Sequence, residues 1–268
     1  MGPKYSICST SYNSVSTVNG FVKPLLNLGS NYEIIIVDNC SSDGTFEKLN
    51  EYGSELKILR SKCSRGRGRQ IAMNLAKGKT IIHVDFDVGY KEIEKVVEFY
   101  EKTSKSSIYY IKSKKYKCNA CIYIGEKYTF DILKGFPDLN HADDTYFNKK
   151  TSNLNMLETI TMDIAHDCLD INGLSSGAES RYERTFLRKA IRRILATRDI
   201  LFVNHFTFSD IMEKYKLKGL KKYTEGMLEY LLGKLLIIPI KVPSIEKEVK
   251  DIKESQKYKL YLNLNNNA

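Results

Sequence analysis

The feature that most constrains the fold is a repeated alternation of short apolar runs with amphipathic segments through the first hundred residues. Residues 5–10, 33–37 and 80–84 are predicted strands. The β-branched run at 33–37 is typical of a strand buried on both faces, as in parallel sheets. Helical periodicity separates the predicted strands, so the sequence predicts an α/β layered domain, a mostly parallel sheet flanked by helices. The predicted helices cover residues 18–28, 45–52, 69–76 and 90–102.

Polar residues stand where the predicted strands stop. Thr10 ends the first of these strands, and Asp38 and Asp85 directly follow the other two. Because ligands of parallel α/β sheets bind beyond the carboxyl ends of the strands, we expect these side chains to mark one binding edge.

Asp85-Phe86-Asp87 is the most informative of these strand ends. Two carboxylates at i and i+2 in extended backbone point to the same side, where they can share a hard divalent cation. Such a cation also binds a diphosphate and neutralises charge on it. Taken alone the motif is weak, because a solvated loop with a helix cap explains it equally well.

The order of the surrounding motifs adds specificity. A strand and loop at 6–13 precede Val37-Asp38-Asn39-Cys40-Ser41-Ser42-Asp43-Gly44-Thr45, then an arginine-bearing segment at 65–70, Ala76-Lys77-Gly78, and the strand that ends in Asp85-Phe86-Asp87. Gly135-Phe136-Pro137-Asp138 and Ala142-Asp143-Asp144 follow. This series resembles the inverting family 2 glycosyltransferases with the GT-A fold, whose pattern reads VDxxSxDGT, DxD, GGFDE and ED. The resemblance covers about residues 5 to 150.

The resemblance implies a metal-assisted single displacement, in which a sugar moves from a UDP- or GDP-sugar to an acceptor hydroxyl or phosphate. It implies Mn²⁺ or Mg²⁺ as cofactor, with Asp87 as the direct metal ligand and Asp85 near the metal or ribose. Arg69 would pair with the diphosphate or with Asp38, whereas Asp43 is better explained as a helix N-cap. The donor-binding residues implied are Thr10, Ser11, Tyr12, Asp38, Arg69, Asp85 and Phe86.

Asp144 corresponds to the general base that takes the proton from the acceptor hydroxyl. Asp143 stands where the family has Glu, and the simpler interpretation of the pair is a helix cap and a carboxylate favoured by the macrodipole. His166 matches a family histidine that can complete the metal site, although a structural role on a strand explains it too. Arg65 and Arg67 are interpreted as part of a solvated face.

The last third of the chain is helical and basic. We expect a catalytic domain over residues 1–177 and a C-terminal helical extension over 178–268, with helices at 179–197 and 210–236. Helices packed on the catalytic domain are the default interpretation. The alternative is attachment to an anionic membrane surface, which suits the lipid-linked acceptors of many proteins of this kind.

The composition limits which other functional classes are compatible with the sequence. The net charge of +10 suits phosphate-bearing partners, which also permits a basic nucleic-acid-binding module, a nucleotide-sugar-binding relative without transferase activity, or a nucleotidyltransferase. Acidic residues at the strand ends disfavour nucleic acid. No apolar stretch is long enough to span a membrane, so we expect a cytoplasmic protein that can be peripheral on the membrane. The six cysteines are expected to be reduced and not to bind zinc, and the sequence leaves sugar, nucleotide and acceptor open.

Overall fold

The structure is a computed structural model that describes residues 2–113, 122–164, 166–168, 186–205, 208–210, 212, 220–237 and 240–266. Within these ranges, side chains are described except for residues 166–168, 186–189, 220–223 and 264–266.

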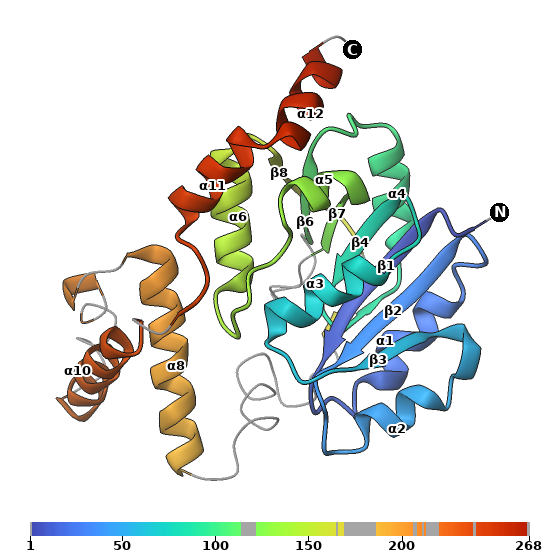
Figure 1. Ribbon diagram of the computed structural model, residues 1–268. Coiled ribbons are helices and arrows are strands. Elements are labelled where there is room, and N and C mark those ends of the chain that lie inside the picture. Colours follow the sequence, from blue (N-terminus) through green and yellow to red (C-terminus); the bar gives the residue numbers. More distant parts are fainter. Residues whose placement is uncertain are drawn as a thin grey trace.

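A seven-stranded sheet forms the centre of the molecule, in the order β3-β2-β1-β4-β7-β6-β8 (Figure 1). The first four of these strands are parallel, and β7 runs antiparallel to both β4 and β6, so the sheet is mostly parallel as predicted. Apart from residues 1–4, the N-terminal half alternates strands and helices, which is why the early strands pair in parallel. The strands are β1 (Tyr5–Ser11), β2 (Tyr32–Asp38), β3 (Lys57–Arg60), β4 (Thr80–Val84), β6 (Ile108–Ser113), β7 (Ile122–Glu126) and β8 (Leu157–Met162).

Helices cover both faces of the sheet and bury a separate apolar core on each. One core packs α1 (Val18–Leu26), α2 (Thr45–Asn50) and α4 (Ile93–Glu101) on the sheet, and η1 (Gly53–Glu55) follows α2. The opposite core is formed with α3 (Arg65–Leu75), α5 (Lys127–Ile132) and α6 (Asp143–Asn153). Strands buried by helices on both sides account for the continuous apolar runs in the sequence.

Helix α3 begins four residues earlier than its predicted start at Arg69. Ser64 caps it by accepting a hydrogen bond from the backbone N–H of Arg67 at 3.1 Å. Gly66 and Gly68 lie inside the helix, although the predicted helix began after them. Glycine is needed there because other segments of the protein pack closely against this turn of the helix. A Cβ on Gly66 would lie 1.9 Å from the Pro137 carbonyl oxygen.

Two short strands outside the main sheet were not predicted. β5 (Val88–Tyr90) pairs antiparallel with β9 (His166–Cys168), with Tyr90 opposite His166. Predicted helix 90–102 therefore starts later, as α4 at Ile93. This pairing brings the backbone of His166 beside the strand that directly follows the Asp85–Asp87 segment.

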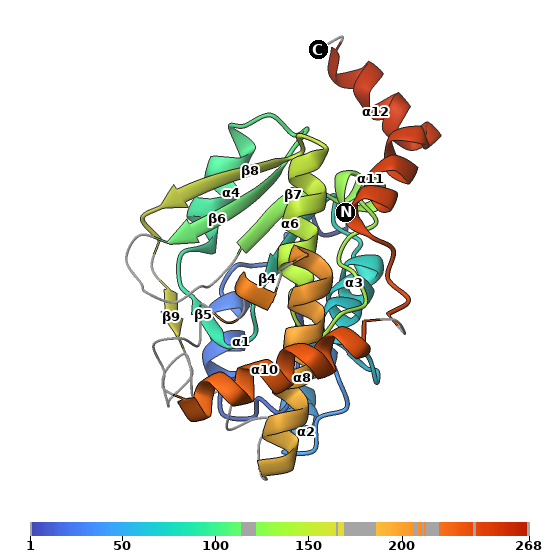
Figure 2. The ribbon, with the colours of Figure 1, turned by 90° about the vertical axis from the view of Figure 1, so that its left-hand side faces the viewer.

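The C-terminal region contributes α8 (Phe186–Asn204), α10 (Leu220–Leu235), α11 (Ile245–Glu254) and α12 (Gln256–Asn266). Apolar side chains of α11 and α12, among them Ile252 and Tyr258, belong to the same core as α3 and α6. Helices α8 and α10 lie to one side of the sheet in Figure 1 and cross each other in front of it in Figure 2, and Val203 of α8 reaches the same core. Within the described residues, no helix combines the length and apolarity required to cross a bilayer.

Candidate active site

A buried arginine joins two segments that the sequence singles out separately. The Nη2 of Arg69 donates to Oδ1 of Asp85 at 2.8 Å, and its Nη1 lies 3.0 Å from Oδ2 of Asp143. The guanidinium also lies over the ring of Phe136, with 5.1 Å between its central carbon and the ring centroid. Arg69 therefore connects the carboxyl end of β4 to the N-terminus of α6. Its predicted pairing with Asp38 is wrong, because Asp85 and Asp143 occupy this guanidinium.

Arg65, one turn earlier on α3, completes the cluster. Its Nε donates to Oδ1 of Asp143 at 2.8 Å, and its Nη2 lies 3.9 Å from Oδ1 of Asp144. Since i and i+4 share a helix face, both arginines reach Asp143 from the same side. The interpretation of Arg65 as part of a solvated face is therefore wrong.

Asp143 is the centre of this network. Its side chain is fully buried, and burial would raise the pKa of the carboxyl group. The guanidinium groups of Arg65 and then Arg69 outweigh that effect and hold the pKa below its ordinary value. Asp143 does not cap α6: the N-cap residue is Ala142, which has a left-handed φ of 56° and makes no capping side-chain bond.

Asp144 lies beside this buried pair at the first turn of α6. Its side chain remains 38% exposed, and its Oδ1 accepts a hydrogen bond from the N–H of Thr145 at 2.8 Å. A carboxylate in this position is open to a second molecule, whereas the carboxylate of Asp143 is enclosed by protein.

Asp38 terminates β2 with no exposed surface. Its Oδ1 accepts from the hydroxyl of Ser11 at 3.2 Å and its Oδ2 from the backbone N–H of Ser41 at 2.9 Å. The hydroxyl of Ser41 also donates to Oδ1. In this arrangement the carboxylate orders the loop after β2.

The other residues of the predicted donor loop lie at the same sheet edge. The Thr10 hydroxyl donates to the carbonyl oxygen of Val37 at 2.9 Å, and Tyr12 is partly buried after β1. Asp43 does not itself cap α2, because the N-cap residue is Gly44, with a φ of 93°. The Asp43 carboxylate instead accepts from the N–H groups of Thr45 and Val15, each at 3.0 Å.

The Asp85–Asp87 segment leaves β4 as a turn, so its backbone is not extended as predicted. Phe86 points into the core: it is 4% exposed and packs against Phe21 with the rings tilted by 33° and 4.5 Å between their centroids. The Phe86 side chain therefore packs in the core and anchors the turn there. Asp85 and Asp87 both remain partly exposed.

A metal requires more oxygen or nitrogen ligands than two carboxylates. Among the residues whose placement is described, no group of three His, Cys, Asp or Glu side chains has an arrangement that could hold a metal ion. The His166 side chain, the third predicted ligand, lies outside the described part of the chain, although its backbone pairs with Tyr90.

The other described histidines of this region have structural contacts. Burial and the charge of Arg69 lower the pKa of His83 to about 3, so the imidazole is neutral and its Nδ1 donates to the carbonyl of Cys8 at 2.9 Å. Burial, with the charge of Arg65, lowers the pKa of His141 to about 4. Cys8, Cys40 and Cys63 are free thiols, as expected.

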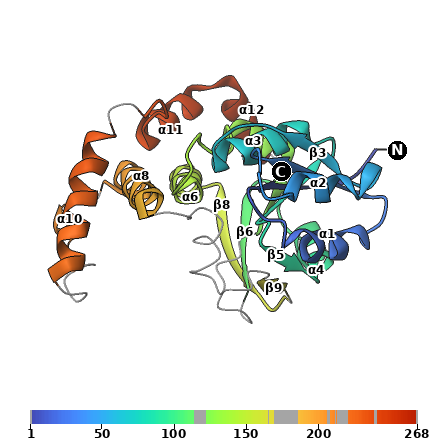
Figure 3. The same ribbon diagram turned by 90° about the horizontal axis from the view of Figure 1, so that it is seen from below.

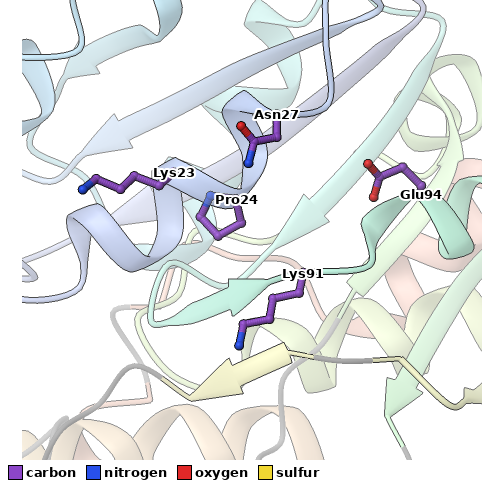
Figure 4. A pocket seen from close by; sticks show the side chains of 5 residues that line it. All are labelled: Lys23, Pro24, Asn27, Lys91 and Glu94. Atoms are coloured by element: carbon purple, nitrogen blue, oxygen red, sulfur yellow. The ribbon is translucent and has the colours of Figure 1, made fainter.

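A shallow surface depression, shown in Figure 4, lies between α1 and the β5–α4 connection, away from this cluster. Its lining is Lys23, Pro24, Asn27, Lys91 and Glu94. None of these residues belongs to the predicted site, and the depression is open to solvent.

The fold and the carboxylate–arginine cluster now permit comparison with known proteins. The sequence profile of Glycosyl transferase family 2 matches residues 6–152, more than half of the chain. The chain belongs to this family. The match contains every predicted site residue except His166, and it ends at residue 152, near the C-terminal end of α6.

Curated relatives match over shorter segments. The chain is 30% identical over 105 residues to the putative teichuronic acid biosynthesis glycosyltransferase TuaG of Bacillus subtilis, covering 36% of this chain and 42% of that protein. It is 26% identical over 92 residues to the poly(ribitol-phosphate) β-N-acetylglucosaminyltransferase TarS of Staphylococcus aureus, covering 31% of this chain and 16% of TarS. The matched segments thus span less than half of these two relatives.

Solved structures extend the likeness to most of the fold. Residues 1–349 of S. aureus TarS superimpose with a TM-score of 0.56 at 18% identity, covering 96% of this chain and 90% of that one. The mannosyltransferase PcManGT of Pyrobaculum calidifontis, solved with GDP-Man and Mn²⁺, gives 0.52 at 12% identity, covering 97% and 83%. At these identities the likeness concerns the fold, which is the GT-A fold expected for the family.

Proposed function

We propose that this protein is an inverting glycosyltransferase that transfers a sugar from a UDP- or GDP-sugar to an acceptor hydroxyl or phosphate. The observation that carries the proposal is the bridge formed by Arg69 between Asp85 and Asp143. It brings the carboxyl end of β4, where the donor diphosphate and metal would bind, next to the start of α6, where a base would act.

The donor would lie along the carboxyl ends of β1, β2 and β4. Asp38 and Ser11 order the loop that would face the nucleoside, with Thr10 and Tyr12 beside it. The structures of TarS with UDP and with UDP-GlcNAc, and of PcManGT with GDP-Man, support a nucleotide-sugar as the donor class. Side chains from several loops would decide between uridine and guanosine.

Asp87 and Asp85 would hold Mn²⁺ or Mg²⁺, because both are partly exposed and supply hard oxygen donors close together at the end of β4. His166 would be the third protein ligand, since β9 brings its backbone to β5. A bound cation would offset negative charge on the departing nucleoside diphosphate. The Mn²⁺ bound by PcManGT supports this assignment.

Asp144 would act as the general base. Its accessible carboxylate would take the proton of an acceptor hydroxyl as the hydroxyl oxygen attacks the anomeric carbon from the side opposite the diphosphate. One new glycosidic bond then forms while the bond from sugar to diphosphate breaks, which inverts the anomeric centre. Asp143 would support this step by holding Arg65 beside Asp144.

Donor turnover tests the proposal without knowledge of the acceptor. Release of UDP or GDP from a panel of nucleotide sugars is measured with Mn²⁺, for the native protein, for Asp144→Asn and for Glu98→Gln, an exposed carboxylate control on α4. We expect Asp144→Asn to retain donor affinity and lose turnover by about 100-fold or more. A binding-only relative would show donor binding with no turnover in any variant, which would refute the enzymatic proposal. Normal turnover in Asp144→Asn would remove Asp144 from the role of base.

A further inference from the structure

Helix α10 exposes a row of apolar side chains. Met227, Leu228, Leu231 and Leu235 are 41%, 57%, 51% and 67% exposed, respectively. Their spacing places all four on one side of the helix, which we call the α10 apolar face. A contiguous row of large apolar side chains in water marks an interaction surface more often than isolated exposed leucines do.

The other side of α10 is already occupied by α8. Arg193 of α8 pairs with Glu229 at 2.9 Å and with Glu225 at 3.6 Å. A Cβ on Gly233 would lie 3.2 Å from the backbone nitrogen of Arg198, so the two helices pack closely. The α10 apolar face therefore points away from the partner that stabilises the helix.

The charges around this face are mainly positive. Both acidic residues of α10 are the ones bound to Arg193, whereas exposed Lys234 lies beside Leu231 and Leu235 on the outer side. Exposed Lys241 follows the helix. The sequence preceding and opening α10 adds further basic residues, namely Lys214, Lys216, Lys218, Lys221 and Lys222.

We propose that the α10 apolar face docks this protein on an anionic lipid surface. Leucine and methionine side chains would enter the boundary between headgroups and acyl chains, and the lysines would meet the negative headgroups. A second copy of the chain fits the face less well, because it would bring two sets of lysines together with no carboxylate on the outer side of α10 to balance them.

The position of α10 gives the docking a consequence for the site. Figure 3 places α10 at the outer edge of the molecule, with α8 between it and α6. Asp199 of α8 accepts a hydrogen bond from the N–H of His141 at 3.0 Å, two residues before Asp143. Docking through α10 would thus hold the start of α6 one helix away from the lipid. If the proposed function holds, this suits an acceptor anchored in that lipid.

Vesicle co-sedimentation tests the docking and requires no donor, metal or turnover. The full chain is mixed with vesicles of phosphatidylcholine alone, and with vesicles that contain 30 mol% phosphatidylglycerol. The variant L228Q/L231Q/L235Q removes the apolar row, and K234E/K241E reverses the described lysines. Leu260→Gln is the matched control, because Leu260 is 55% exposed but lies on α12.

We expect the native protein and Leu260→Gln to bind the anionic vesicles, more weakly as salt is added. The triple leucine variant should bind roughly tenfold or more weakly with an unchanged unfolding midpoint. K234E/K241E should lose part of the binding to anionic vesicles only. Absence of native binding, or equal binding by the triple variant, would overturn the proposal. Native self-association that the triple variant abolishes, without vesicle binding, would assign the face to a second copy instead.

Discussion

Arg69 and Asp143 form an ion pair in which neither partner is accessible to solvent, with 3.0 Å between Nη1 and Oδ2. The pair connects α3 with α6, which are far apart in the sequence. Because a charge buried without a partner is costly, each residue depends on the other. The pair therefore holds the two segments of the site together and contributes to the stability of the fold.

Replacement of Arg69 by Met should be strongly destabilising. It removes one of the two guanidinium groups at Asp143 and the arginine that binds the Asp85 carboxylate, while the apolar stem is retained. We expect the free energy of unfolding to fall by about 3 kcal/mol, measured by urea denaturation at pH 7. Arg67→Met is the matched control, since Arg67 is exposed on the same helix and should tolerate the change. An equal loss of unfolding free energy in both variants would show that the buried ion pair does not cause the destabilisation.

The acid stability of the protein should depend on Asp143. The arginines depress the pKa of this carboxyl group in the folded state, so its stabilising contribution is complete above the unfolded value of 3.8. That contribution is lost as the pH falls from 3.8 through the lower folded-state value. We expect the native protein to lose stability over this interval more steeply than Asp143→Asn does. Parallel stability curves for the two proteins, from thermal unfolding at several pH values, would contradict the depressed pKa.

Substitution of Gly66 by Ala should destabilise the protein, although the same change inside an ordinary helix is stabilising by about 0.5–1 kcal/mol. The new Cβ would lie 1.9 Å from the carbonyl oxygen of Pro137, and backbone has to move to accommodate it. We expect a loss of about 2 kcal/mol in the free energy of unfolding. Gly2→Ala, where a Cβ meets nothing within 4 Å, is the control. A gain in stability for Gly66→Ala would show that the loop at Pro137 does not press on α3.

We expect the stability of the protein to depend on the buried Lys150 at alkaline pH. Burial lowers the pKa of this lysine to about 8 from 10.5, against the opposing charge of Glu248, to which its Nζ lies at 3.4 Å. Between these values the unfolded chain binds more protons than the folded one, so the free energy of unfolding rises with pH. The stability of the native protein relative to Lys150→Met should increase from pH 8 to pH 10.5, by at most about 1.4 kcal/mol per unit. The exposed Lys253→Met should show no such trend.

Local sequence patterns were sufficient for the parallel half of the sheet. The apolar run that ends at Asp38 could only be a buried strand, and the strand before Asp85 was predicted with its observed bounds. Helix α3 was predicted too short, because glycine usually weakens a helix. Here contacts with residues some 70 positions away in the sequence require glycine at Gly66.

The contacts that define the site join residues far apart in the sequence, so local sequence patterns could not predict them. Arg65 pairs with Asp143 over 78 positions, and because the predicted helix began at Arg69, the sequence did not place Arg65 and Arg69 on one helix face. Likewise, the hydrogen bond from Tyr146 to Glu248 joins α6 to α11 within a common core. Packing of the last helices on the catalytic domain was the default interpretation of the sequence, but the residues that make the contact could not be named from local patterns.

The most direct test of the central claim is a titration of UDP and GDP into the protein by calorimetry, with Mn²⁺ and with EDTA. If Asp87 holds the cation that binds the donor diphosphate, the native protein and Glu98→Gln should bind one of the nucleotides only with Mn²⁺. Asp87→Ala should then lose at least about tenfold in affinity while its unfolding midpoint is unchanged. Nucleotide binding that is equally tight in EDTA, or unchanged in Asp87→Ala, would contradict a metal-assisted donor site at the end of β4.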